Sequence, residues 1–434
     1  MSQTASAPVP APSAASSSAP SSAPSVPQAQ GSAARATGPF SENVPRLLNR
    51  LQALAVAACL VFGVAAAVVQ VLSWQAAGRA ADNTEQVVLV QRIQSLLLRA
   101  DAVATNSYLS DGLEPADARA EYDEAIDDVL RLITLAAEAQ PADRNVLVEL
   151  NQKVSAYTNA VSQARDYNRQ QLPIGIAYLN EAGSTLRTEA QPILTALVDT
   201  NSARAEDEMH GQHPFWLLGL GLLALLVLFW ANRQVAQRFR RRFNLGLVVA
   251  AAVVAVLAVV TAGHAVLKNN DDDATRDGAY TEAIEAATAR TAANNAAAFD
   301  SLGLVNRGSG QSLYEPLYDA QSQLVLDNTD GELQQLWRAY DGVHDKIRGD
   351  DNDGRWNAAV ATAISTDAQS PRARLASFDD AAAAVVDSAG QEASDGFRDG
   401  EILSIALAII TLLGAILAAG AATRGIDVRR REFS

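Results

Sequence analysis

The sequence has one cysteine, two methionines and four histidines among 434 residues. A single cysteine, Cys59, cannot form an intramolecular disulfide, so any folded domain in this chain must be held together by packing. No phosphate-binding loop, dinucleotide fingerprint, kinase signature, G-x-S-x-G elbow or HExxH motif occurs. The sequence therefore predicts no catalytic residue, no cofactor and no enzyme activity.

Charged side chains are missing from four long apolar runs. These are Leu51–Trp74, Phe215–Ala231, Leu245–Leu267 and Ile402–Ala422, and none contains Lys, Arg, Asp or Glu. A helix needs roughly 20 apolar residues to cross a bilayer, with about 17 as the lower limit. We predict a transmembrane helix in each run. Pumps and carriers usually keep an ionisable residue deep in a span, so the composition of these runs disfavours transport.

The remaining residues are divided by charge. The formal net charge is -15, yet the stretch NRQVAQRFRRRFN at 232–244 holds five arginines and no acid: Arg233, Arg238, Arg240, Arg241 and Arg242. By contrast, residues 75–214 hold 11 basic and 21 acidic side chains, and residues 264–400 hold 11 and 24. Short segments rich in Lys and Arg stay in the cytoplasm. We predict a multi-pass membrane protein, with both termini and 232–244 cytoplasmic and the acidic segments outside.

The arginine-rich turn at 232–244 has two interpretations. It fixes the orientation of the chain and contacts anionic lipid of the inner leaflet, where each basic residue contributes about 1 kcal/mol. Alternatively, it is also a docking surface for a cytosolic protein. The sequence favours the first and leaves the second open.

The segment 75–214 is predicted to form an antiparallel four-helix bundle. Breakers at SDGLEP, QP and QQLP divide it into four pieces of helical periodicity. Apolar residues at three- and four-residue spacing mark the expected core seams: Leu147, Leu150, Val154, Tyr157, Val161 and Ala164 in the third piece, and Ile126, Leu130, Ile133 and Ala137 in the second. Four such helices with short connections form a bundle. The first and fourth are expected to run straight into the membrane spans.

The segment 268–400 repeats this plan. GSG, NTDG and GDDNDG act as breakers, and Pro371 opens a final helix. Residues 1–40 are rich in Ala, Pro and Ser and predict a disordered cytosolic tail, whereas 423–434 form a basic cytosolic tail. The predicted fold is all-α: four transmembrane helices, two extracytoplasmic four-helix bundles in tandem repeat, and a disordered N-terminal tail.

Candidate binding residues are few. Arg165, Asn168 and Arg169 cluster at the end of the third predicted helix, where they would clamp a ligand carboxylate or simply face solvent. His210 and His213 have a spacing that suits a metal, but no third ligand is placed by sequence. GDDNDG resembles a calcium loop only partly, because Gly349 and Val360 stand where ligands are required. No metal site is predicted.

The stretch QRIQSLLLRADAVATNSYL at 91–109 resembles the first helix of the four-helix-bundle sensor domains of bacterial chemoreceptors and sensor histidine kinases. WRAYDGVHDKIRGDDNDGRWNAAVATA at 337–363 is similar to the third helix and following turn of such domains. The doubled layout and the Ala/Pro/Ser tail resemble the tetraspanning GlnX-type proteins of actinobacteria. TRGIDVRRREFS at 423–434 stops where a signalling helix would begin in a chemoreceptor, which favours output through a partner.

This resemblance implies a transmembrane sensor in a bacterial plasma membrane, which detects an amino acid such as glutamate or glutamine. It implies two partners, an extracytoplasmic solute-binding lipoprotein and a cytosolic Ser/Thr protein kinase. Membrane lipid and a second copy of the chain, as a homodimer, are further expected contacts, and nucleic acid is not. The alternative is a non-enzymatic membrane scaffold of the cell envelope or secretion machinery.

Overall fold

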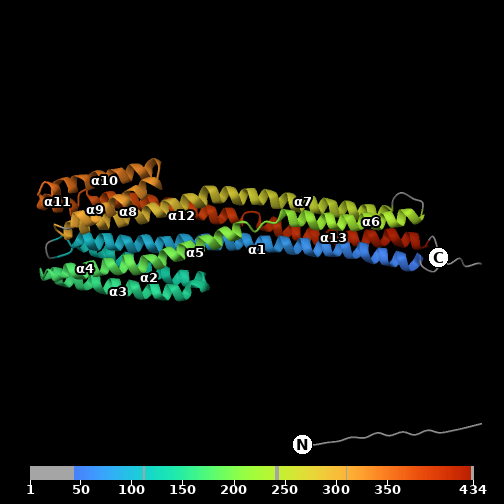
Figure 1. The fold of residues 1–434 in the computed structure, drawn as a ribbon, viewed down its shortest axis with the longest axis horizontal. Helices are drawn as coiled ribbons and strands as arrows, with labels where there is room; N and C mark the ends of the chain where they lie inside the picture. The colour runs from blue at the N-terminus through green and yellow to red at the C-terminus, as the bar shows by residue number, and fades with distance from the viewer. Residues whose placement is uncertain (1–43, 111–112, 240–243, 309, 432–434) are drawn as a thin grey trace, which may run out of the picture. The chain divides into compact units, whose positions relative to one another are not determined.

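The computed structural model describes residues 44–110, 113–239, 244–308 and 310–431, and within them every regular element is helical (Figure 1). The chain divides into two units, Met1–Leu47 and Leu48–Ser434. All of the helices lie in the second unit, apart from the first turn of α1. The predicted disordered tail, residues 1–40, lies outside the described residues. The all-α fold class predicted from the sequence is confirmed.

Helix α1 (Val44–Ser107) joins an apolar part to a polar part without a break. Its 64 residues include the apolar run 51–74 and the stretch 91–109 almost to its end. At about 1.5 Å per residue the helix is about 96 Å long, roughly three times the thickness of the hydrocarbon core of a bilayer. One helix therefore connects a membrane-spanning segment to the far end of the polar region.

The first bundle comprises residues 75–209. Its elements are the polar part of α1, α2 (Ala116–Ala139), the 3₁₀ turn η1 (Pro141–Asp143), α3 (Arg144–Arg169), α4 (Ile174–Thr185), the π-helical turn η2 (Leu186–Ala190) and α5 (Gln191–Met209). One apolar core contains side chains from all four helical pieces, for example Ile93, Val129, Leu150 and Leu194. Because α4, η2 and α5 follow one another without interruption, they act as a single fourth helix.

The predicted seams are confirmed in the third helix and shifted in the second. All six residues of the predicted α3 seam are buried. In α2, Leu130 is 40% exposed, whereas its neighbour Val129 is completely buried. The two apolar residues are adjacent, so periodicity alone could not choose between them. Two residues before Pro192, the fourth helix contains the π turn η2, after which the N–H of Gln191 bonds to Leu186 O.

The second bundle comprises residues 268–398 and contains one helix more than predicted. Its elements are the end of α7 (Leu245–Thr275), the π-helical turn η3 (Arg276–Tyr280), α8 (Thr281–Val305), α9 (Gly310–Asp327), α10 (Gly331–Asn352), the short α11 (Trp356–Ala363) and α12 (Pro371–Arg398). GDDNDG ends α10 rather than forming a loop throughout, and Gly354 there has φ +76°, which favours glycine. The tandem plan of two helical bundles is present.

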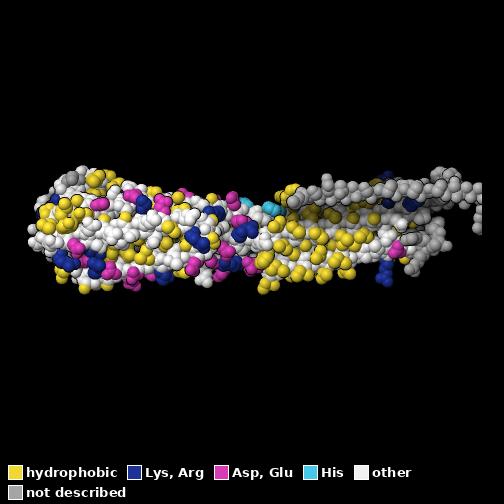
Figure 2. Space-filling model, turned by 90° about the horizontal axis from the view of Figure 1, so that it is seen from below, with side chains coloured by type: hydrophobic (Ala, Val, Ile, Leu, Met, Phe, Trp, Pro, Cys, Tyr) yellow, Lys and Arg dark blue, Asp and Glu magenta, His cyan; other side chains and the backbone are white. Residues whose placement is uncertain are grey.

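The four apolar runs lie in α1, α6 (Pro214–Phe239), α7 and α13 (Glu401–Arg431), and each helix is long and apolar enough to cross a membrane. They pack closely through small residues: a Cβ added at Gly63 would clash with Ala415, and one at Gly221 with Ala258. Outward-facing side chains such as Phe215, 86% exposed, and Leu417, 72% exposed, are apolar. Figure 2 shows hydrophobic side chains gathered over this part of the chain and charged side chains over the bundles.

Two of the four helical connections between the apolar part and the bundles are unbroken, and two are interrupted. Helix α1 is continuous, and α7 continues through η3 into α8. Helices α5 and α6 are separated at 210–213, and α12 and α13 at 399–400, where Gly400 has φ +76°. For the first bundle, the prediction of an unbroken connection is therefore confirmed for the first helix and wrong for the fourth.

Candidate functional site

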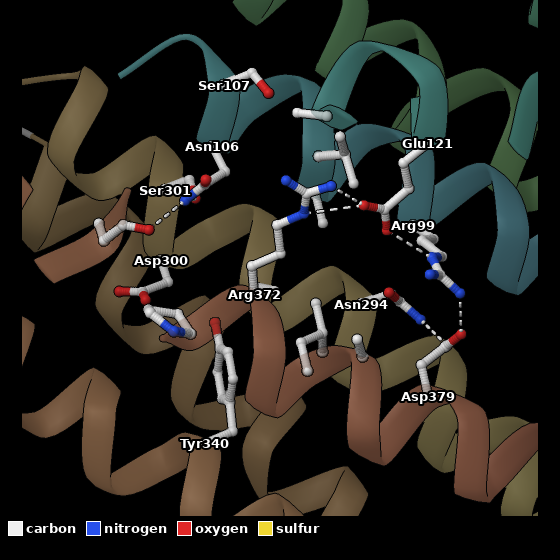
Figure 3. Close-up of a pocket in the computed structure, with 18 residues that line it drawn as sticks. Arg99, Asn106, Ser107, Glu121, Asn294, Asp300, Ser301, Tyr340, Arg372 and Asp379 are labelled. Atoms are coloured by element: carbon white, nitrogen blue, oxygen red, sulfur yellow. Dashed lines mark hydrogen bonds and ion pairs between the residues drawn. The ribbon is translucent and has the colours of Figure 1, made fainter. Parts of the chain in front are cut away.

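The two bundles are joined side by side by charged residues from α1, α2, α8 and α12. We call Arg99, Glu121, Arg290, Arg372 and Asp379 the bundle junction. Arg99 on α1 donates to Glu121 Oε1 at 3.0 Å and to Asp379 Oδ2 at 2.9 Å, thereby linking the first bundle to α12 (Figure 3). Arg372 on α12 donates through Nη2 to Glu121 Oε2 at 2.7 Å. The junction therefore joins residues about 250 to 280 positions apart in the sequence.

Asp379 is the centre of the junction. Its side chain is 1% exposed and accepts hydrogen bonds from Arg290 at 2.8 and 2.9 Å and from Asn294 at 2.7 Å, in addition to Arg99. A buried carboxylate is tolerated only when it is paired and hydrogen-bonded, and here two guanidinium groups and an amide supply the partners. If one of these helices shifted along its neighbours, a buried charge would lose a partner. The junction therefore holds α1, α8 and α12 in one register.

A small cavity of about 50 Å³ lies beside this network, between α1, α2, α8 and α12. Its polar walls bond to one another: Asn106 Nδ2 donates to Ala363 O at 3.0 Å, and Arg372 and Glu121 close another side. Ligand pockets for drug-sized molecules are about 300 Å³ or more. In this arrangement the junction is a closed contact between the bundles, and a relative shift of α1 and α12 requires the exchange of ion pairs.

A second set of contacts joins the bundles next to the apolar helices. Arg398, the last residue of α12, donates to Asp82 Oδ1 and to Glu85 Oε1, both at 2.6 Å, and both acceptors lie on α1. On the other side of α12, Lys268 Nζ donates to Gly396 O and Phe397 O at 3.0 Å each. The end of α12 is therefore fixed to both unbroken helices, α1 and α7, just before its connection to α13.

The predicted ligand contacts Arg165, Asn168 and Arg169 lie together at the end of α3, beside a pocket of about 220 Å³. Arg165 is 11% exposed and donates to Glu114 Oε1 at 2.8 Å. Asn168 Nδ2 donates to Tyr108 O at 3.3 Å, whereas Arg169 is 62% exposed. The structure thus brings the three side chains to one pocket, and their role as ligand contacts stays a prediction.

The arginine-rich stretch 232–244 is helical at its start. Helix α6 extends through Asn232 to Phe239, so Arg233 and Arg238 lie on a helix rather than in a turn, and Arg233 is exposed. Arg240, Arg241 and Arg242 lie outside the described residues. Asn244 caps α7 by accepting from the N–H of Gly246 at 3.1 Å and donates to Gly425 O at 2.9 Å. The end of this stretch is therefore attached to α13.

The histidines considered as metal ligands have other neighbours. His210 Nδ1 lies 2.8 Å from Glu206 O, and its Nε2 lies 3.3 Å from Arg276 Nη1. In the breaker GDDNDG, Asp350 and Asp353 accept from Arg355. Within the part of the chain that the structure describes, no group of three His, Cys, Asp or Glu side chains is placed to hold a metal ion.

Sequence reasoning missed the bundle junction. Arg99 lies within the stretch that resembles a sensor helix, but nothing local distinguishes it from the other arginines of the chain. The sequence feature that could have indicated it is a charged residue at a position expected to be buried. Asp379 directly follows the buried Phe378, and Arg290 lies in a helix rich in buried alanines. Charged residues at such positions need a partner, but the sequence does not say which.

Comparison with known proteins gives one match. Residues 76–210, which span the whole first bundle, match the family model of the actinobacterial sensor domain. Searches of curated proteins and of solved structures found no match. The matched region begins just after the first apolar run and ends just before the second. This match and the four apolar helices together support an actinobacterial membrane sensor, the class that the sequence resembles.

Proposed function

We propose that this chain is a transmembrane receptor whose bundles lie outside the cytoplasm, detect a ligand there and pass the signal to a cytosolic partner. The observation that supports this most is the unbroken course of α1 and of α7–η3–α8 from the apolar helices to the bundle junction. A displacement at the junction moves these helices as rigid elements. Signalling also requires two states with different affinity for the ligand, and exchange of the junction ion pairs supplies a discrete second state.

The resemblance to GlnX-type proteins favours particular partners. The ligand is then an amino acid such as glutamate or glutamine, detected through a solute-binding lipoprotein, and the cytosolic partner is a Ser/Thr protein kinase. The acidic composition of both bundles and the basic residues of 232–244 support the orientation with the bundles outside. In this proposal the chain is not an enzyme and acts through its partners.

Co-purification from cells tests the receptor proposal. The intact protein is isolated with and without added glutamate or glutamine, and bound lipoprotein and kinase are quantified. We expect ligand-dependent recovery of both partners, and its loss in Glu121→Gln, which removes the carboxylate that Arg99 and Arg372 share at the junction. The matched control is Arg131→Gln, whose guanidinium pairs with Asp128 on the exposed face of α2. Failure of the wild-type protein to recover either partner, with unchanged kinase substrates in a deletion strain, would contradict the proposal.

The alternative is a membrane scaffold without a ligand. Two features of the junction favour the scaffold: its charges are already paired with one another, and the cavity beside it is small. A scaffold needs the junction only for stability. In that case Glu121→Gln changes the thermal midpoint of the protein and leaves the recovery of every partner independent of added amino acid.

Replacement of Arg240, Arg241 and Arg242 by Gln separates the two roles of the arginine-rich stretch. Inverted or failed insertion, measured by the accessibility of a terminal tag, shows that these residues set topology. Correct insertion with loss of kinase recovery shows that they also form a docking surface.

A further inference from the structure

The interior of the first bundle contains a cluster of polar side chains from four helical elements. They are Asp101 on α1, Tyr122 on α2, Tyr157 and Arg165 on α3, and Arg187 on η2. The rings of Tyr122 and Tyr157 lie 6.5 Å apart, and the guanidinium of Arg165 lies 3.9 Å from the centre of the Tyr122 ring. Arg187 Nη2 donates to Asp101 Oδ2 at 2.6 Å. Asp101 and Tyr157 are fully buried. We call this set the polar cluster.

Many hydrogen-bonding atoms of the polar cluster have no partner among the described residues. They are Asp101 Oδ1, Tyr122 Oη, Tyr157 Oη, Arg165 Nε, Arg165 Nη1 and Arg187 Nε. Each buried polar atom without a partner costs about 1 to 3 kcal/mol, so native proteins keep few of them. Five of the six are N–H or O–H groups. The first bundle therefore concentrates donors at one place, as a site for an acceptor-rich ligand does.

The pocket of about 220 Å³ meets this cluster at Arg165, which lines the pocket and belongs to the cluster. The charged residues of its wall are Arg119, Arg165 and Arg169 against a single carboxylate, Glu114. Arg119 also donates to Asp123 at 2.9 Å, and Arg169 lies 3.9 Å from Asp166, so Arg165 is the wall arginine that keeps donors without a partner among the described residues. The volume is below the range of about 300 to 1,000 Å³ for drug-sized ligands, so the pocket suits a smaller anion.

Glu114 shows what chemistry the pocket accepts. Its carboxylate occupies one N–H of Arg165 at 2.8 Å and lies 4.0 Å from Arg119. It is therefore a carboxylate of the protein in the position where a ligand carboxylate would bind. Glu114 lies directly before α2, one residue ahead of Pro115, so its displacement moves the connection between α1 and α2, the two helices that carry Arg99 and Glu121.

We propose that the first bundle binds a small carboxylate directly in this pocket, with Arg165 as its principal contact, in competition with Glu114. Arg165 brings to this contact two donors, Nε and Nη1, that have no partner among the described residues. This assignment rests on the proposed receptor function, since it names the ligand class that the receptor detects. It also goes beyond that function, because it places a ligand site in the chain itself, in addition to the proposed binding lipoprotein.

Direct binding to the full-length protein in lipid nanodiscs tests the assignment. Isothermal titration is carried out with glutamate, succinate, glutamine and inorganic phosphate as probes. We expect saturable binding of glutamate or succinate, at least tenfold weaker in Arg165→Gln and several-fold tighter in Glu114→Gln, which removes the internal competitor. The exposed pair variant Arg131→Gln is the matched control and should bind like the wild type. Preference for phosphate over both carboxylates would overturn the ligand class.

Two outcomes would overturn the site itself: no saturable binding by either the wild type or Glu114→Gln, or binding that Arg165→Gln leaves unchanged. If Arg165→Gln does not fold, the pocket-rim variant Arg119→Gln takes its place, with an expected several-fold loss of affinity. Binding without recovery of a kinase would support the site and contradict the proposed output. Recovery of both partners without direct binding would contradict the site and leave the receptor proposal intact.

Discussion

The two bundles share a plan but differ in how their buried polar groups are satisfied. In the first, the polar cluster leaves donors unpaired beside a pocket. In the second, His344 contacts Asp300 at 3.0 Å and Glu315 at 3.4 Å, and Arg348 donates through Nη2 to Asp300 at 3.1 Å, so that Arg348 Nε is the one buried atom of this network without a hydrogen-bond partner among the described residues. Polar networks with partners rigidify a core, whereas unpaired donors leave it able to respond to a ligand. In the proposed receptor, the first bundle detects and the second is the fixed reference.

The largest expected effect comes from removing one buried carboxylate in each bundle. Asp300→Ala leaves His344 and Arg348 without their shared partner in an apolar core and should lower the free energy of unfolding by about 3 to 5 kcal/mol. Asp101→Ala should cost less, about 1 to 3 kcal/mol, because Arg187 is 19% exposed and can turn toward water. Chemical denaturation in nanodiscs measures both. Equal losses of stability would show that the buried polar groups of the two bundles depend on their partners to the same extent.

Titration of His344 should make the second bundle sensitive to alkaline pH. Burial alone lowers the pKa of His344, but hydrogen bonds to Asp300 and Glu315, and their charges, raise it to about 9. The unfolded value is about 6.5. The charged imidazole therefore stabilises the fold fully below about pH 6.5, and this contribution, on the order of 3 kcal/mol, is lost as the pH rises through 9.

The measurement is the thermal midpoint of the wild type and of His344→Gln between about pH 6.5 and 9. The wild type should lose stability across this window, and the variant should show a flatter profile at a lower midpoint. Parallel profiles would mean that His344 is not the titrating group. Trp337 lies in the core cluster of the second bundle and Trp356 packs against it, so a change in tryptophan fluorescence reports this bundle once the signal of Trp74, Trp216 and Trp230, which lie in the apolar runs, is subtracted by replacing these three with Phe.

Two matched Tyr→Phe substitutions, one in each bundle, should have smaller effects on stability, and these effects should differ in sign between the two bundles. Tyr318 Oη donates to Asp341 Oδ1 at 2.9 Å, so Tyr318→Phe should destabilise the protein by about 1 kcal/mol. Tyr157 Oη has no partner, so Tyr157→Phe should leave stability unchanged or raise it by about 1 kcal/mol. A loss of stability in Tyr157→Phe without added ligand would contradict the comparison.

The sequence predicted more of the helices than of the contacts between them. Apolar spacing is a local property, and it placed the α3 seam correctly from Leu147 to Ala164. It could not decide between Val129 and Leu130, since adjacent apolar residues differ only in what packs against them. The link between Arg99 and Asp379 joins residues 280 positions apart and depends on how the two bundles meet. Of the candidate site, only the grouping of Arg165 and Asn168 was accessible from the sequence.

The smallest expected effect is at Arg398, which joins the bundles beside the apolar helices. Its side chain is 36% exposed, so the pairs with Asp82 and Glu85 contribute about 1 kcal/mol or less and are screened by salt. Arg398→Gln should therefore shift the unfolding transition only slightly, and by less still at about 1 M salt, where the Debye length is about 3 Å.

Because this variant should change stability so little, it can test signal output separately from folding. Helix α12 ends at Arg398, and the break before α13 leaves the contact of Arg398 with Asp82 and Glu85 as a direct route from the second bundle to α1. A variant that keeps its stability and its carboxylate binding but loses ligand-dependent kinase recovery would place the output on α1. Unchanged recovery would place it on the junction at Asp379 instead.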